Sequence, residues 1–380
     1  MVIKCLAYYD ALDSKDKRVN SPAAYTKTAY VIDCFKRLGY KVDILSASNA
    51  IGKKGAKGST RSIDEGVTLR TLSSLGRGHK VKNVISTTLF SLNLLFHLLF
   101  FVHKGDVLWV YHSLPLMKYI KLLKGIKKFK LILEAEEIYG DVDNSQKTIE
   151  KELACFNYAD AYIFCTQLLS GTANPSGKPE AVSHGSYQAQ PCFDVHFDDD
   201  KIHVVYAGTF NPKKGGVFTA INAGRFLDER YHLHVLGGGT ADEVQNIKKL
   251  VKKASAATQC TITYDGFFNG KNYLKFLQKC HIGLSTQNPY EQFNQSSFPS
   301  KVLVYMANGL RVVSIKAPAV CDSSVKDYVW FCDEATPQSV AETIKIIDLN
   351  APYDGRKIIS NLDSGFLESL ERLLKDLASK

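Results

Sequence analysis

Acidic residues are scarce in the first third of this 380-residue chain. Residues 1–130 contain 23 Lys and Arg but only 8 Asp and Glu, a net charge of +15, whereas the other 250 residues contain 25 and 30, a net charge of −5. A basic segment of this kind can face nucleic acid, anionic lipid headgroups or a diphosphate, although a charge run is usually a solvated face. No zinc finger, RRM or similar signature accompanies the charge, so we expect no nucleic-acid partner.

Motifs that would define several enzyme classes are also missing. The sequence has no Walker A pattern (GxxxxGK[ST]), and Gly237-Gly-Gly239 is not GxGxxG, which argues against a P-loop nucleotidase or a dinucleotide-dependent dehydrogenase. The nine cysteines are scattered without CxxC or Cys/His clusters and indicate buried thiols in a reducing compartment. The first residues are typical of a strand rather than of a secretion signal. We therefore expect a cytoplasmic protein.

Apolar strands and amphipathic helices alternate along most of the chain. The expected strands are Val2–Tyr9, Lys41–Ser46, Val67–Leu72, Asp106–Tyr111, Lys130–Ala135, Ala161–Cys165, Ile202–Ala207, His232–Leu236, Thr261–Tyr264, His281–Ser285, Arg311–Ile315 and Val329–Phe331. Such alternation is typical of parallel sheets covered by helices on both faces. The predicted fold class is α/β, with two Rossmann-like parallel-sheet domains that face each other across a deep cleft.

The domain boundary is expected in the aperiodic stretch Ser186–Asp200, which contains Pro191 and an acidic run. We therefore predict an N-terminal domain over residues 1–188 and a C-terminal domain over residues 189–361. Residues 362–380 form an amphipathic closing helix, expected to pack back onto the N-terminal domain. A Gly-, Lys- and Ser-rich loop is expected at Asn49–Arg61.

The apolar stretch Thr87–Val102 admits two interpretations. It is short for a bilayer span, and Asn93 and His97 interrupt it, which favours a core helix of the first domain. A helix lying on a membrane surface stays open as the alternative, because the same part of the chain is basic. An anionic membrane surface is therefore a candidate partner.

The segment 294–313 combines a polar loop, a helix start at Pro299, a helix stop at Gly309 and a β-branched strand. Hydroxyl groups and Lys301 lie at the helix start, where free N–H groups and the positive end of the helix dipole favour an anion. The alternative is the αβ unit of an ordinary sheet protein. Gly208, the pair Lys213 and Lys214, and the turn at Gly237–Gly239 follow other strands of the same domain, and such groups suit a diphosphate.

Three acidic residues follow a strand of the first domain: Glu134, Glu136 and Glu137. Side chains alternate across a strand, so Glu134 and Glu136 share a face. A carboxylate there can orient or deprotonate an acceptor hydroxyl, and we name Glu136 as a candidate catalytic residue. The alternative is a solvated strand end with a helix-capping carboxylate.

Several segments together carry a family resemblance. They are Tyr206-Ala-Gly-Thr-Phe-Asn-Pro-Lys-Lys-Gly215, Leu236-Gly-Gly-Gly239, Tyr264-Asp-Gly-Phe-Phe268 and Ser297-Phe-Pro-Ser-Lys-Val-Leu-Val-Tyr-Met-Ala-Asn-Gly-Leu-Arg-Val-Val313. The second domain resembles the donor-binding half of retaining nucleotide-sugar glycosyltransferases with the GT-B fold, the group 1 (family 4-like) enzymes that build bacterial capsule, exopolysaccharide and O-antigen chains. Glu150–Asp160 and Val182–Ser186 also fit the order of that family.

The resemblance implies a donor site and a first-domain histidine. The implied donor-binding residues are Gly208, Thr209, Lys213, Lys214, Gly238, Phe267, Phe268, Ser296, Ser297, Ser300 and Lys301. Lys214 matches the diphosphate-binding lysine. Ser296, Ser297 and the N–H groups around Ser300 would hold the distal phosphate, and the two phenylalanines would pack on the nucleobase. His112 matches the histidine that faces the transferred sugar, with a hydrogen-bonded strand-end histidine as the alternative.

The sequence departs from the family pattern at two glutamates, whose positions hold Ser296 and Val304. Ser296, Ser297 and Lys301 are expected to replace the missing carboxylate contacts. The resemblance implies that the protein transfers a sugar, with retention of configuration, from a nucleoside-diphosphate sugar to a saccharide or lipid-diphosphate-linked acceptor. It implies no metal or other cofactor. The expected location is the cytoplasm or the inner face of the membrane. Two alternatives stay open: a nucleotide-sugar 2-epimerase and a non-catalytic partner subunit.

Overall fold

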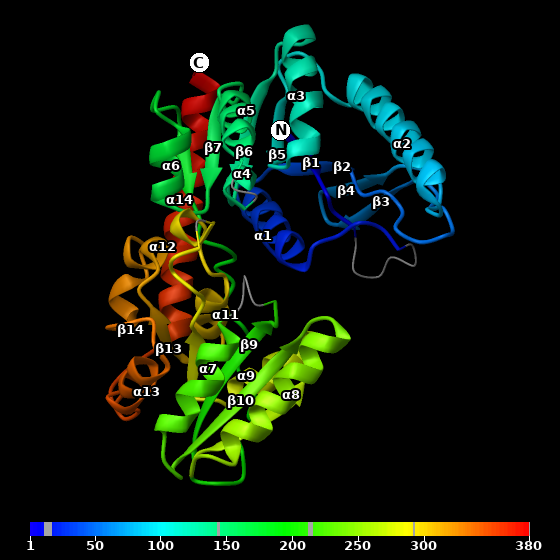
Figure 1. Cartoon of the computed structure of the whole chain (residues 1–380). Coiled ribbons are helices and arrows are strands. Elements are labelled where there is room, and N and C mark those ends of the chain that lie inside the picture. The colour runs from blue at the N-terminus through cyan, green and yellow to red at the C-terminus, as the bar shows by residue number, and fades with distance from the viewer. Residues whose placement is uncertain (11–16, 143–144, 212–215, 292, 380) are drawn as a thin grey trace. The chain divides into compact units, whose positions relative to one another are not determined.

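The computed structural model describes residues 1–10, 17–142, 145–211, 216–291 and 293–379, in two compact units. Unit 1 comprises Met1–Cys165, Leu169–Ser186 and Phe366–Lys380, and unit 2 comprises Thr166–Leu168 and Tyr187–Gly365. Each unit is built on one sheet with helices packed against it (Figure 1). The prediction of an α/β chain with two parallel-sheet domains is therefore confirmed.

Unit 1 contains an eight-stranded sheet of order β3-β4-β2-β1-β5-β6-β7-β8. Its strands are β1 Val2–Ala7, β2 Lys41–Ser46, β3 Ser59–Asp64, β4 Val67–Thr71, β5 Val107–Tyr111, β6 Lys130–Ala135, β7 Ala161–Phe164 and β8 Glu180–Val182. Its helices are α1 Pro22–Arg37, α2 Lys80–Phe101, α3 Leu114–Ile126, α4 Tyr139–Val142, α5 Gln146–Phe156 and α6 Gln167–Ala173. The described strands pair in parallel, except that β3 runs antiparallel to β4. The predicted loop Asn49–Arg61 is thus wrong at its end, where β3 begins.

Helix α1 shows how local sequence sets these elements. Pro22 occupies the first helical turn, where its missing N–H removes no hydrogen bond. Val31, Ile32 and Phe35 recur at helical spacing and are buried. The chain leaves the helix at Gly39, whose φ of +83° is readily adopted by glycine. The apolar face of α1 therefore packs on the sheet.

Unit 2 contains a six-stranded parallel sheet of order β11-β10-β9-β12-β13-β14. Its strands are β9 Ile202–Thr209, β10 Tyr231–Gly238, β11 Thr261–Gly266, β12 Ile282–Ser285, β13 Arg311–Ile315 and β14 Val329–Cys332. Its helices are α7 Val217–Ala223, η1 Gly224–Phe226, α8 Ala241–Ser255, α9 Gly270–Gln278, α10 Phe293–Ser296, α11 Lys301–Ala307, α12 Pro318–Cys321, η2 Lys326–Tyr328 and α13 Pro337–Lys345. A βαβ order of this kind places the loops that follow the strands at one edge of the sheet.

Helix α14, Gly355–Ser379, is longer than the predicted closing helix. Its first turns belong to unit 2, and from Phe366 onward it belongs to unit 1. The ring of Phe366 stacks on that of Tyr30 in α1, with centroids 5.8 Å apart.

Tyr305 fixes helix α11 to the sheet of unit 2. Strands β12 and β9 pair at only two positions, Ile282–Val204 and Gly283–Val205. Just beyond them the backbone N–H of Ala207 donates a 2.8 Å hydrogen bond to the Tyr305 hydroxyl instead of to a strand carbonyl. The ring of Tyr305 lies on Gly283, where an added Cβ would come within 2.3 Å of ring atom Cγ. Gly283 therefore permits the close approach of α11 to β12.

We predict that Gly283→Ala lowers the free energy of unfolding by about 1–3 kcal/mol, because the new methyl group overpacks against the Tyr305 ring. Gly125→Ala is the matched control, since a Cβ at this helical position in α3 meets no atom within 4 Å. It should be neutral or stabilise by up to about 1 kcal/mol. Urea denaturation of both variants measures the effect, and equal stabilities would contradict this account of the contact.

Candidate functional site

The last residues of β9 and β10 form a closely packed pair of glycine turns in unit 2. Gly208 is in register with Gly237, and Thr209 with Gly238. Gly237 has φ of +135°, and a Cβ there would come within 1.8 Å of the Gly208 carbonyl oxygen. Side chains are therefore excluded where the two turns meet, and Gly208, Gly237 and Gly238 are only partly buried there.

Lys301, at the start of α11, lies over the first of these turns. A Cβ added to Gly208 would lie 3.0 Å from Lys301 Nζ, and Nζ lies 4.2 Å from the centroid of the Tyr206 ring. The lysine side chain is partly buried, and burial lowers the pKa of Lys301 to about 8. Within the described residues this ammonium group forms no ion pair with a carboxylate. The site therefore holds a desolvated cation beside the partly exposed backbone of Gly208.

The two predicted nucleobase residues have different surroundings. Phe267 is exposed and lies near Gly238, where an added Cβ would be 3.6 Å from Phe267 Cδ2. Phe268 is partly buried and stacks on Phe276 of α9, with centroids 5.1 Å apart. Phe267 can thus offer a free ring face to a ligand, whereas one face of Phe268 is covered.

The remaining predicted donor residues lie around α10 and α11 or outside the described residues. Ser296 ends α10, Ser297 follows it, and both are partly buried. Ser300 is exposed immediately before α11. Lys213 and Lys214 lie outside the residues that the structure describes. The predicted helix start at Pro299 is two residues early, and the predicted stop at Gly309, with φ of +87°, is confirmed.

In unit 1, His112 follows β5 and is almost completely buried. Its Nε2 lies 2.6 Å from Glu152 Oε1, and Glu152 also accepts hydrogen bonds from the backbone N–H groups of Tyr139 and Gly140. Among the described residues, His112 Nδ1 has no hydrogen-bond partner. Glu152 therefore fixes the imidazole by one nitrogen, and the other nitrogen is buried and unpaired. Glu152 itself was not singled out from the sequence, because it sits in α5, 40 residues away.

The carboxylates at the end of β6 differ in environment. Glu134 is completely buried and accepts a 2.9 Å hydrogen bond from Trp109 Nε1, and burial raises the pKa of Glu134 to about 8. Glu136 is only partly buried and lies 3.6 Å from Nζ of Lys27, which also donates to the Ser183 carbonyl oxygen. The solvated strand end proposed for these residues is therefore wrong for Glu134. Glu136 remains the accessible carboxylate of the pair.

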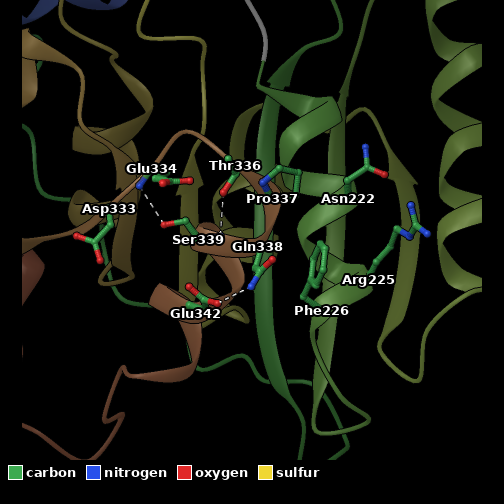
Figure 2. A pocket seen from close by; sticks show the side chains of 10 residues that line it. All are labelled: Asn222, Arg225, Phe226, Asp333, Glu334, Thr336, Pro337, Gln338, Ser339 and Glu342. Atoms are coloured by element: carbon green, nitrogen blue, oxygen red, sulfur yellow. Dashed lines mark hydrogen bonds between the residues drawn. The ribbon is translucent and has the colours of Figure 1, made fainter.

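Two cavities have linings that include none of the site residues described above. The first, of about 630 Å³, belongs to unit 2 and lies between the α7–η1 region and the start of α13, as Figure 2 shows. Its polar lining includes Asn222, Arg225 and Glu342, and none of its lining residues was predicted as a donor residue. The second, of about 490 Å³, belongs to unit 1 and includes Tyr9 and Tyr25, whose rings stack at 4.8 Å.

A histidine cluster, unforeseen from the sequence, lies near the amino ends of β9 and β10. Atoms of His203, His232 and His234 that could bind a metal lie within 4.8 Å of one another. His203 Nδ1 lies 2.9 Å from His234 Nε2, His203 Nε2 lies 2.7 Å from Asp199, and His232 Nε2 lies 3.0 Å from the Thr263 hydroxyl. These nitrogens already have protein partners, so the cluster is hydrogen-bonded without an ion.

Sequence comparison identifies the domain that carries the glycine turns. Residues 192–357, which lie within unit 2, match the family Glycosyl transferases group 1. Residues 192–357 therefore form a group 1 glycosyltransferase domain. No curated protein sequence matches the chain.

Solved structures match over the whole chain. One, from E. coli, is described as trehalose-6-phosphate bound with UDP-2-fluoro glucose (10% identity, 99% of both chains covered, TM-score 0.69). A sucrose-phosphate synthase from Thermosynechococcus elongatus matches at 13% identity, 100% of both chains and a TM-score of 0.70. A UDP-forming trehalose-phosphate synthase from Burkholderia xenovorans, in complex with glucose-6-phosphate, matches at 12% identity, 99% of this chain, 100% of that chain and a TM-score of 0.63. At these identities the likeness shows the fold, which is GT-B.

The buried Glu134 predicts a pH dependence of stability. Its pKa is raised by burial to about 8 in the folded protein, from about 4.5 in the unfolded chain, so between these values the folded state holds a proton that the unfolded state has released. The free energy of unfolding should therefore fall as the pH rises from about 5 to about 8.

Glu134→Gln should flatten this dependence and exceed the wild-type stability at pH 8, because an amide can still accept from Trp109 without ionising. The exposed Glu368→Gln serves as the control. Urea titrations at a series of pH values measure both, and a wild-type stability that is constant over this range would contradict the buried, protonated state.

Proposed function

We propose that this glycosyltransferase moves a sugar from a nucleoside-diphosphate sugar to a saccharide or lipid-diphosphate-linked acceptor, with retention of configuration, in surface polysaccharide biosynthesis. Unit 2 binds the donor and unit 1 binds the acceptor. The reaction takes place in the cytoplasm, at the inner face of the membrane. Lysine side chains, rather than a metal ion, neutralise the diphosphate in this proposal.

One observation supports the donor site above the others: the desolvated cation of Lys301 lies beside the partly exposed backbone of Gly208 without a carboxylate partner among the described residues. A cation in such a place is unfavourable until an anion arrives. A diphosphate would accept hydrogen bonds from Lys301 and the glycine turns, and its charge would raise the lysine pKa again. Phe267 would pack on the base, while Lys213, Lys214 and the serines 296, 297 and 300 complete the phosphate contacts.

On the acceptor side, we assign His112 and Glu136 to the chemistry. Glu152 holds His112 Nε2 at 2.6 Å, so the unpartnered Nδ1 would contact the transferred sugar. Glu136 would orient the acceptor hydroxyl. Retention requires no strong base, because the leaving diphosphate can take the acceptor proton while the protein stabilises the charge of that group.

A panel of nucleotide sugars tests this function against its two alternatives. Slow hydrolysis of one donor, or transfer to an added acceptor, is expected of a transferase. Release of a free epimer would instead identify a nucleotide-sugar 2-epimerase. Binding of no donor by thermal shift, together with no turnover of any donor, would favour a non-catalytic partner subunit.

We predict that Lys301→Met weakens binding of the diphosphate of the preferred donor, chosen from UDP, GDP, ADP and dTDP, by about 10- to 100-fold, the usual range for a lost charged hydrogen bond. Without ligand the variant should be at least as stable as the wild type at pH 7, because burying the lysine charge is unfavourable when its pKa lies near 8.

Lys316→Met is the matched control, since Lys316 is exposed and pairs with Asp333 at 3.4 Å. It should leave the affinity unchanged. Calorimetric titration and thermal unfolding give the two readouts. An unchanged affinity in Lys301→Met would exclude Lys301 from the donor site, whichever reaction the enzyme catalyses.

A further inference from the structure

Helix α2 carries two apolar stripes on opposite sides. The inner stripe contains Ser86, Phe90, Leu94, Leu98 and Phe101, all buried. The outer stripe contains Val81, Ile85, Leu89, Leu92, Phe96 and Phe100, whose side chains are 49–66% exposed. Steps of three and four residues place all six on one face of the helix. The prediction of a core helix is therefore right for the inner stripe and wrong for the outer one.

The outer stripe is larger than the scattered apolar residues of an ordinary protein surface. Six large side chains in a row over 20 residues form a continuous strip, and such strips mark binding surfaces. In Figure 1, α2 (cyan) lies at the outer side of unit 1, well apart from α5 and α6. The outer stripe is thus accessible within its unit.

The length and composition of α2 would also suit a membrane span, but its packing does not. Lys80–Phe101 is 22 residues long and apolar enough to cross a bilayer, and it is longer than the predicted Thr87–Val102. Its inner stripe, however, belongs to the hydrophobic core of unit 1. Nζ of Lys127 donates to the carbonyl oxygens of Leu99 and Val102 and ties the last turn to the end of α3. The helix can therefore lie on a bilayer without leaving the domain.

The charges around α2 indicate which kind of surface the helix can bind. Residues 66–133 contain 11 Lys and Arg and a single acidic residue, Asp106. Lys80 and Lys82 are exposed in the first turn of α2, and Lys104 is exposed just beyond its last turn. Exposed Lys121 and Lys128 belong to the α3 region, whose end contacts the end of α2. Lysines at both ends of an apolar strip are typical of a helix at an anionic lipid interface.

We propose that the outer stripe of α2 docks unit 1 onto the surface of an anionic bilayer. The six apolar side chains enter the boundary between headgroups and acyl chains, while the lysines at both ends of α2 contact lipid phosphates. A second copy of this chain is the less favourable occupant, because an isologous pair of antiparallel helices would bring the lysines at one end of α2 close to those at the other end of its copy. The inference rests on the proposed function only in placing the protein at a membrane. Binding to lipid vesicles is measured without any catalytic turnover.

Sedimentation with sucrose-loaded vesicles of 70% phosphatidylcholine and 30% phosphatidylglycerol tests the docking surface, with pure phosphatidylcholine vesicles as the reference. The full chain should partition at least about tenfold more strongly onto the anionic vesicles. Leu92→Glu/Phe96→Glu should lower this partitioning by about tenfold or more, because two charges enter the apolar strip. Raising the NaCl concentration from 0.1 to 0.5 M should weaken binding, as expected for contacts with lipid charge.

Two matched controls isolate the stripe and the charges. Phe226→Glu/Ile346→Glu makes the same change at exposed apolar positions of unit 2 and should bind vesicles like the wild type. Lys80→Glu/Lys82→Glu should lose the preference for anionic vesicles, whereas Lys249→Glu/Lys253→Glu on exposed positions of α8 should keep it. Circular dichroism melts establish that each variant is folded.

Three results would overturn the proposal: no sedimentation of the wild type with anionic vesicles, equal binding by a folded Leu92→Glu/Phe96→Glu variant, or a wild-type dimer that this variant converts to monomers in light scattering. The last result would identify a second copy as the occupant. Donor hydrolysis in the same samples separates the two proposals, because a failure of vesicle binding with retained hydrolysis affects only the docking surface.

Discussion

The hydroxyl group of Tyr305 is the contact on which the geometry of the donor edge depends. Strands β9 and β12 separate after two paired residues, and the N–H of Ala207 would lack a partner there without the Tyr305 hydroxyl. Helix α11 has only seven residues, so tertiary contacts rather than helix propensity hold it in place. Lys301 lies four residues before Tyr305, on the same face of α11. A neutral contact in the core therefore determines where the cation sits.

A comparison of two buried lysines shows why Lys301 is the informative one. Lys27 in unit 1 is more buried, yet its Nζ donates to a backbone carbonyl and lies 3.6 Å from Glu136. Its charge is thus compensated within the fold. Lys301 contacts the face of the Tyr206 ring, a weaker interaction than an ion pair, and burial alone lowers its pKa. The fold leaves the charge of Lys301 incompletely compensated, and an anionic ligand would supply what is missing.

Features set by local periodicity could be predicted from the sequence, whereas features set by packing between distant elements could not. The bounds of β2, β6 and β13 agree with the prediction because their β-branched and apolar runs are short and sharply ended. The burial of Glu134 depends on its contact with Trp109 in the neighbouring strand. The alternation of side chains along β6 shows on which face of the sheet Glu134 lies, but not how deeply it is buried. The His203–His234 contact depends on the pairing of β9 with β10. Likewise, an apolar stretch in the sequence shows that a helix forms. It does not show that only one side of α2 is covered by the rest of unit 1.

The two halves of the chain can attract anions by different physical means. The first 130 residues have a net charge of +15, and exposed charges act over distances that salt shortens to about 10 Å at 0.1 M. Unit 2, which carries the donor edge, contains 19 Lys and Arg and 18 Asp and Glu, a net charge of +1, so it offers a diphosphate little long-range attraction. Recognition there must come from short contacts in a poorly solvated place, which salt screens far less. Binding of lipid and binding of donor should accordingly respond differently to ionic strength, because one depends on a long-range field and the other on the desolvation of a single lysine.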